Sequence, residues 1–303
     1  MKFYLAIIIA CLIFFISSCS SISKNEISKQ KLKLNIQTNS INKERIIEIL
    51  LKDKINFDVN FTNNNSYFLE DDVLNSNLNF FCNSLLQDER EVIEKTLFKD
   101  KKDLNKKILI IYTKKFDDLV LTLKKRYPYE EYFILDTRDY ETQIQKILNI
   151  DKSIIKNKRL SKLDTKIQIS HTPRVRNDIL SIYFITDYNT GKTVVPIFKS
   201  YALNINYYSS SEIFHDATDI KKLVDFEGTF IPITKKVLEN LNNTQLTTIK
   251  SEIEKTLVKD FLTIEKIRQN SLFKNRIKPD SGNLSIEKNS CVARDLNFWK
   301  ITS

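Results

Sequence analysis

Two arginines and an aspartate precede the most apolar segment of the chain. Arg174 and Arg176 flank Val175, and Asp178 follows. Pro173 disfavours helix at the residue before it, so we expect an extended backbone here. On an extended backbone, side chains two residues apart project to the same side and form a small cationic edge. Such an edge suits an anion or an acidic protein, which makes Arg174, Arg176 and Asp178 the candidate partner-binding residues. An internal ion pair with Asp178 is the alternative.

Residue types that commonly carry catalysis or bind metals are scarce. The 303 residues include 2 His, at positions 171 and 215, and 3 Gly, at 191, 228 and 282. This spacing excludes the H-E-x-x-H zinc motif, the G-x-G-x-x-G motif and the P-loop. We expect a structural or solvent-exposed role for His171 rather than a catalytic one. The sequence therefore predicts no catalytic set, no metal site and no cofactor, and so a protein that is not an enzyme.

The first 19 residues have the pattern of an export signal. Lys2 is followed by the apolar run Phe3–Ile16 and then by Ser17, Ser18 and Cys19. A charged start, an apolar region and small residues are typical of a signal peptide, and the run is shorter than the about 20 residues of a transmembrane helix. The ending resembles a bacterial lipobox, in which the cysteine becomes the acylated amino terminus. Cys11 also fits that pattern but leaves an apolar region of about six residues, below the usual minimum.

We therefore predict a lipoprotein signal peptide over residues 1–18 and lipidation, including palmitate, at Cys19. A plain secretory signal or an uncleaved anchor is the alternative. Ser20 after the cysteine is similar to outer-membrane sorting signals, so the expected location is the outer membrane, facing the periplasm. The polar, non-periodic residues 19–32 are expected to be a tether. Two or three acyl chains would make this membrane anchor stable.

Two further cysteines, Cys82 and Cys291, lie in strand-like segments near the two ends of the chain. The oxidising compartment outside the cytoplasm permits a disulfide between them if these segments share a lobe. Two buried free thiols, behaving as small apolar side chains, are equally compatible with the pattern. Both states stay open at this point.

The composition is that of a globular protein with a basic surface. The chain is 42% hydrophobic and 11% aromatic, with a formal net charge of +10. A positive charge suits an anionic partner such as a membrane surface or a polymer. However, lysine is spread along the chain, and no dense basic tract is interleaved with aromatic residues, so we expect no nucleic-acid binding.

Alternating helix and strand patterns follow one another from residue 87 to residue 208. Short apolar runs of the kind found in buried strands alternate with stretches whose apolar residues recur at helical spacing. The expected strands are Lys107–Tyr112, Tyr132–Leu135, Ile179–Ile185 and Leu203–Tyr208, and the expected helices cover 87–98, 116–123, 140–148 and 194–201, with Pro196 in the first turn of the last. This alternation predicts a parallel sheet with helices on both faces. Residues 151–177 interrupt it, are rich in Lys and Arg, and are too long for a routine connection, which makes them a candidate functional element.

Several of these segments together resemble the LppC/LpoA family of outer-membrane lipoproteins, which are penicillin-binding protein activators. The segment His171–Ile185, HTPRVRNDILSIYFI, is similar to the family pattern PRRRxDIDAIFL. Pro196, the run Leu203–Tyr208 before a serine cluster, and Asp225–Gly228 follow in the family's order. The tail, SGNLSI and then RDLNFW, is similar to the family's closing hairpin. The resemblance covers about residues 85–303.

The resemblance implies an α/β fold of the type I periplasmic-binding-protein class, with two lobes of parallel sheets flanked by helices. Residues 33–84 and 209–303 would form a first lobe, which is shortened, and residues 85–208 the second lobe. It also implies a non-enzymatic protein that binds and stimulates a bifunctional peptidoglycan synthase, a class A penicillin-binding protein. The alternative function on the same fold is a periplasmic solute-binding lipoprotein for a transporter or sensor.

Overall fold

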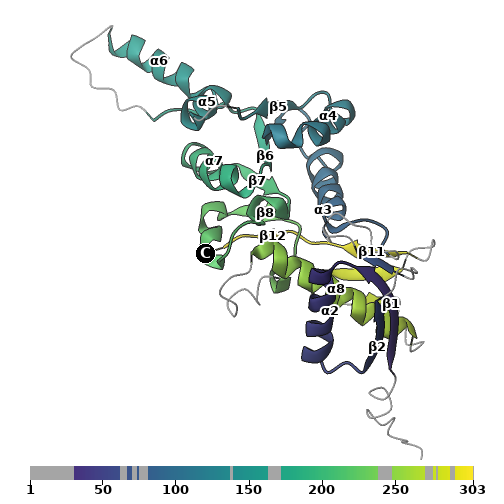
Figure 1. Ribbon diagram of the computed structural model, residues 1–303. Coiled ribbons are helices and arrows are strands. Elements are labelled where there is room, and N and C mark those ends of the chain that lie inside the picture. Colours follow the sequence, from purple (N-terminus) through teal and green to yellow (C-terminus); the bar gives the residue numbers. More distant parts are fainter. Residues whose placement is uncertain are drawn as a thin grey trace, which may run out of the picture.

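The strand β6 (Ile179–Ile185) lies in the middle of the larger of two lobes in the computed structural model (Figure 1). Its side chains alternate between two apolar clusters: Ile182 and Phe184 enter one, and Tyr183 and Ile185 enter the other. Both faces of the sheet are therefore covered, which explains why β6 is apolar at almost every position. The structure describes residues 31–61, 67–69, 74, 81–136, 139–162, 172–237, 248–269, 276–277, 279–286 and 291–302.

Around β6, the described strands of the larger sheet run in the order β12-β8-β7-β6-β4-β5. Neighbouring strands are parallel, except that β12 is antiparallel to β8. Their bounds are β4 (Lys107–Tyr112), β5 (Glu131–Ile134), β7 (Asn206–Ser209), β8 (Thr229–Ile231) and β12 (Trp299–Lys300). The predicted parallel sheet is confirmed.

Helices cover both faces of this sheet. On the face with Tyr183 lie α3 (Leu85–Glu94), its π-helical continuation η2 (Lys95–Lys99), the short turn η3 (Lys114–Phe116) and α4 (Asp117–Arg126). On the face with Phe184 lie α5 (Tyr140–Ile147) and α7 (Tyr188–Tyr201). The helix α6 (Ile150–Ser161) follows α5, and η4 (Ser211–Phe214) and η5 (Ile220–Phe226) follow β7.

The helix predicted over 194–201 exists, but Pro196 was expected in its first turn and lies in the interior of α7 instead. The helix begins earlier than its apolar residues indicated because the carboxylate of Asp187 caps it, accepting a hydrogen bond from the backbone N–H of Thr190 at 2.9 Å.

The smaller lobe is built on a parallel sheet of order β2-β1-β3 among its described strands. These are β1 (Leu32–Thr38), β2 (Phe57–Phe61) and β3 (Tyr67–Leu69). The helices α2 (Ser40–Lys52) and α8 (Ile249–Gln269) pack against each other, and α8 also contacts β1. An antiparallel sheet of β9 (Arg276–Ile277), β10 (Asn283–Ile286) and β11 (Val292–Asp295) includes the expected closing hairpin, β10–β11.

The expected division of the chain differs from the hydrogen bonding at two strands. The sequence placed residues 209–303 with the smaller lobe, whereas β8 and β12 pair with the sheet built by residues 85–208. The physical reason is that the sheet continues past β7: Tyr207 lies opposite Thr229, and Trp299 lies opposite Ile231. The chain thus passes between the lobes at residues 82–84 and 296–298, and once more between β8 and α8.

Candidate functional site

The three residues predicted to bind a partner lie just before β6, and two of them are bonded to each other. The guanidinium of Arg176 donates to both carboxylate oxygens of Asp178, at 2.6 and 2.5 Å, and to both oxygens of Glu131, at 2.7 Å each. These bonds lower the pKa of Asp178 and raise that of Arg176. The structure therefore shows the internal ion pair that the sequence left open. Arg174 is exposed, and partner binding by this segment stays a prediction.

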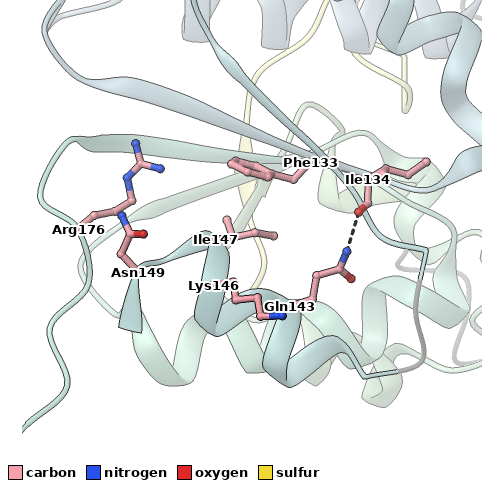
Figure 2. A pocket seen from close by; sticks show the side chains of 7 residues that line it. All are labelled: Phe133, Ile134, Gln143, Lys146, Ile147, Asn149 and Arg176. Atoms are coloured by element: carbon pink, nitrogen blue, oxygen red, sulfur yellow. Dashed lines mark hydrogen bonds between the residues drawn. The ribbon is translucent and has the colours of Figure 1, made fainter. Parts of the chain in front are cut away.

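A groove of about 320 Å³ lies beside this ion pair, between the edge strand β5 and helix α5 (Figure 2). Its lining residues are Phe133, Ile134, Gln143, Lys146, Ile147, Asn149 and Arg176. The side-chain amide of Gln143 donates to the carbonyl of Ile134 at 2.9 Å, on the side of β5 that faces away from β4. This bond uses a carbonyl that would otherwise be available to an added strand. The lining of the groove contains no Ser, Thr, Cys, His, Asp or Glu side chain.

Helix α6 accounts for the first part of the basic element predicted over 151–177. It packs on α5 and extends away from the larger sheet (Figure 1). Ile150 is buried and Ile154 is half-buried, so these two residues face the protein. Five basic residues in α6 and at its C-cap are exposed: Lys152, Lys156, Lys158, Arg159 and Lys162.

Where the two lobes meet, a disulfide joins Cys82 and Cys291, whose Cα atoms are 5.1 Å apart. Of the two states that the sequence left open, the structure contains the bonded one. Cys82 lies just before Ser84, the N-cap of α3, and Cys291 directly precedes β11. The backbone N–H of Cys82 also donates to the carbonyl of Val292 at 3.0 Å. The disulfide therefore links two segments that lead from one lobe into the other.

Removing this disulfide is expected to lower the free energy of unfolding by about 2–4 kcal/mol, because it links residues 209 positions apart and so restricts the unfolded chain. The measurement is denaturant unfolding of the double variant Cys82→Ser/Cys291→Ser. Wild-type protein under reducing conditions should show the same midpoint as the variant. If reducing agent left the wild-type midpoint unchanged, the two cysteines would be free thiols.

Next to the disulfide is a buried ion pair between the lobes. A guanidinium nitrogen of Arg294 donates to a carboxylate oxygen of Asp88 at 2.9 Å, and the two side chains are 3% and 8% exposed. The same nitrogen donates to the carbonyl of Asn83 at 3.0 Å, and the guanidinium stacks on the ring of Phe81 at 3.8 Å. Asn83 in turn donates to Asp88 at 3.0 Å. A network of this kind fixes the start of α3 relative to β11.

Glu89 is a further buried ionisable side chain at this junction. One of its oxygens accepts the backbone N–H of Ser211 at 2.7 Å, and among the described residues the other has no hydrogen-bond partner. Burial raises its pKa to about 8, against the smaller opposing effect of the Ser211 bonds. Neighbouring Arg90 pairs with Glu212 at 2.6 Å. Glu89 is therefore largely protonated at neutral pH.

The apolar core is continuous across the junction. One cluster contains Leu34 of β1, Leu50 of α2, Phe261 of α8 and Phe184 of β6. In addition, the first N–H groups of α8 donate to the carbonyls of Ala217 and His215 at 2.8 and 3.0 Å. The two lobes therefore share a core, hydrogen bonds and a buried ion pair beside the disulfide.

Several predicted residues lie outside the described part of the chain: the signal peptide, Cys19, most of the tether and His171. His215 is within it, 3.1 Å from the hydroxyl of Ser211 through Nε2. Across the described residues, no group of three His, Cys, Asp or Glu side chains is arranged to hold a metal ion. None of the helices within them is long and apolar enough to span a membrane.

Asp88, Glu89 and Arg294 were not identified from the sequence as junction residues. Arg294 belongs to the tail motif RDLNFW, but that motif indicated only a hairpin. Charged residues are usually exposed, and in this chain only the tertiary packing distinguishes these three.

Neither a protein-family profile nor a curated protein matches the sequence. Among solved structures, the chain is similar to one from Chromobacterium violaceum assigned to a branched-chain amino acid ABC transporter. The TM-score is 0.56 at 9% identity, and the match covers 90% of this chain and 100% of that one. This likeness shows the periplasmic-binding-protein fold.

The solved structures also include the family that the sequence motifs resemble. Full-length LpoA from Haemophilus influenzae matches with a TM-score of 0.42 at 12% identity, over 89% of this chain and 46% of that one. The LpoA C-domain from the same organism, a regulator of PBP1A, matches with a TM-score of 0.42 at 11% identity, over 89% of this chain and 79% of that one. The chain spans about half the length of full-length LpoA.

Proposed function

We propose that this chain is a non-enzymatic outer-membrane lipoprotein that binds and stimulates a bifunctional peptidoglycan synthase, a class A penicillin-binding protein. The observation that carries the proposal is the ordered resemblance of its motifs to the LppC/LpoA family. On the structure these motifs fall in chain order on the approach to β6 and β6 itself, on α7, β7 and the end of η5, and on β10, β11 and β12. The motifs therefore occur in both lobes, in the order in which the family has them.

The contacts between the lobes favour a role in which the chain binds another protein through a fixed surface. Solute-binding proteins of two lobes commonly close around their ligand by a hinge motion. In this chain the disulfide Cys82–Cys291, the buried pair Arg294–Asp88 and a shared apolar core connect the lobes. Each of these contacts would resist a change in the angle between the lobes. A fixed arrangement suits protein recognition better than ligand closure.

Stimulation would work through the conformational equilibrium of the synthase. A protein that binds the active conformation more tightly than the inactive one raises the population of the active conformation. A tenfold shift requires about 1.4 kcal/mol of differential binding free energy. A few surface contacts can supply this difference, so no catalytic group of this chain is needed.

The membrane anchor is part of the proposal. An acylated Cys19, followed by the tether over 19–32, would hold the folded part at the periplasmic face of the outer membrane. From there the folded part of the chain would contact the synthase across the periplasm.

Direct binding tests the proposal. The full chain is titrated against the class A synthase of the same organism, with a monofunctional penicillin-binding protein as the control partner. Saturable binding to the synthase alone is expected. No binding at high micromolar concentration, or equal binding to both enzymes, would contradict the proposal.

The alternative is a periplasmic solute-binding lipoprotein that serves a transporter or sensor, because the fold of the Chromobacterium violaceum structure suits this function too. Fold alone does not assign function. A bound solute would stabilise the protein, by about 2.7 kcal/mol at 100 times its dissociation constant. A thermal-shift screen with amino acids and other metabolites distinguishes the two functions, since the scaffold proposal predicts no stabilising solute.

A further inference from the structure

We infer that the outer face of α6 is the docking surface for an acidic protein partner. This basic face is defined as Lys152, Lys156, Arg159 and Lys162 around Ile155, together with Arg174 beside the helix. The inference rests on the proposed function in taking the synthase as the first partner to test. It assigns the contact to a surface that excludes Arg176 and Asp178, whose charged groups are bonded within the protein.

Within the part of the chain that the structure describes, the charges of the basic face have no ion-pair partner. Its lysines and arginines are all exposed, and no ion pair involves them within the described residues. The one carboxylate of α6, Asp151, lies in its first turn and is half-buried. Such a density of like charge on one helix raises the local positive potential and attracts an acidic surface.

Helix α6 packs on the protein with its inner side, so the basic face is exposed to solvent. Asn149, with φ of 57°, turns the chain sharply between α5 and α6. Buried Ile150 and half-buried Ile154 hold the inner side of the helix against the protein. Figure 1 shows α6 extending beyond α5, away from the larger sheet. The outer side is therefore accessible along the whole helix.

Arg174 extends the basic face at the base of the helix. Its backbone N–H donates to the hydroxyl of Ser153 at 3.2 Å, which holds the segment before β6 beside α6. The side chain of Arg174 is exposed, so its positive charge lies near the helix. Of the three predicted partner-binding residues, Arg174 alone belongs to the basic face.

The apolar residues of α6 favour a protein partner over a lipid bilayer. Ile155 and Leu160 are exposed by 49% and 47%. Five residues apart, they lie about 140° from each other around the helix, with basic residues between them. A helix that inserts into a bilayer surface needs one continuous apolar face. In α6, the continuous apolar face packs against the protein and is not available to a bilayer. An isolated Ile155 among cations fits a shallow apolar spot within an acidic protein surface.

Nucleic acid is a poorer fit to the basic face. Single strands are bound by stacking bases on aromatic side chains, and α6 contains no aromatic residue. The location proposed for the chain is also outside the cytoplasm.

The test compares two variants with the same change in net charge. The docking variant is Lys152→Glu/Lys156→Glu/Arg159→Glu, and the control variant is Lys221→Glu/Lys235→Glu/Lys236→Glu, at lysines that are exposed and lie on other elements. Because all six sites are exposed, both variants should fold with the wild-type circular dichroism spectrum.

Binding of the full chain to the class A synthase is measured at low and at physiological salt. The docking variant is expected to raise Kd at least about tenfold, mainly by slowing association, and to weaken the salt dependence. The control variant should stay within about twofold of wild type. Equal affinity of the wild type and both variants would overturn the inference while leaving the proposed function intact.

If the wild type does not bind the synthase, the proposed function fails and the basic face is judged by crosslinking. A photo-crosslinking residue replaces Ile155 in the full chain in intact cells, with Leu121, which is 54% exposed on α4, as the control position. The inference then predicts an adduct with one identified acidic protein, absent from the Leu121 position and lost when the docking substitutions are added. Adducts with lipid only, or no adduct from Ile155, would overturn it.

Discussion

Replacing Arg294 by methionine is expected to lower the free energy of unfolding by about 3–5 kcal/mol, because Asp88 then remains as an uncompensated buried charge. Both side chains are almost fully buried, at 3% and 8% exposure. Among the described residues, the side chain of Asp88 would keep only its bond from Asn83, and Phe81 would lose the guanidinium stacked on its ring. The measurement is the urea midpoint of Arg294→Met at neutral pH.

The matched control is Lys259→Met, which breaks the pair between Lys259 and Asp280. That pair is 3.3 Å long and its side chains are 42% and 34% exposed, so its loss should cost at most about 1 kcal/mol. Adding Asp88→Leu to Arg294→Met should restore part of the lost stability, because the isolated charge is then removed. A cost below 1 kcal/mol for Arg294→Met would show that the pair does not hold the junction.

Glu89 is expected to make the protein less stable as the pH rises from about 4.5 to about 8. The pKa of Glu89 is about 8 in the folded protein, raised by burial from its ordinary value of 4.5. Between these two values the unfolded chain has lost the proton and the folded protein still holds it, so rising pH favours unfolding. Above pH 8 the folded protein contains a buried carboxylate, and the full penalty applies, on the order of 5 kcal/mol.

The variant Glu89→Gln removes this ionisation while keeping an oxygen for the backbone N–H of Ser211. Its stability relative to wild type should therefore increase steadily between pH 5 and pH 8, measured by denaturant unfolding at each pH. The control Glu48→Gln, at an exposed position of α2, should stay within about 0.5 kcal/mol of wild type throughout. Parallel pH profiles for wild type and Glu89→Gln would show that Glu89 is not held protonated in the fold.

The larger sheet could be predicted from sequence because its central strands are short apolar runs, as expected for strands covered on both faces. β4 and β6 are buried on both faces, so nearly every residue is apolar, and the neighbouring helices show helical spacing. The lobe boundary could not be predicted in the same way. β8 and β12 contain 3 and 2 residues, too few to show a period, and their place depends on pairing with distant strands.

The charged residues were harder to assign, since residue type does not reveal burial. The ion pair between Arg176 and Asp178 was open from sequence as the alternative to partner binding, because the two residues are two positions apart, whereas Glu131 is 45 positions away in sequence. Glu89 and Arg294 resemble ordinary surface residues. The basic insertion was predicted to be a candidate functional element, and the structure adds that its first part is a helix with one exposed face.

The rate of peptide cross-linking by the class A synthase tests the central claim most directly. The rate is measured while the full chain is titrated into a fixed amount of synthase and its lipid-linked substrate. The account predicts a saturable increase that follows the binding curve and is reduced for the docking variant of α6. A rate that stays constant at concentrations where the chain is bound would contradict it.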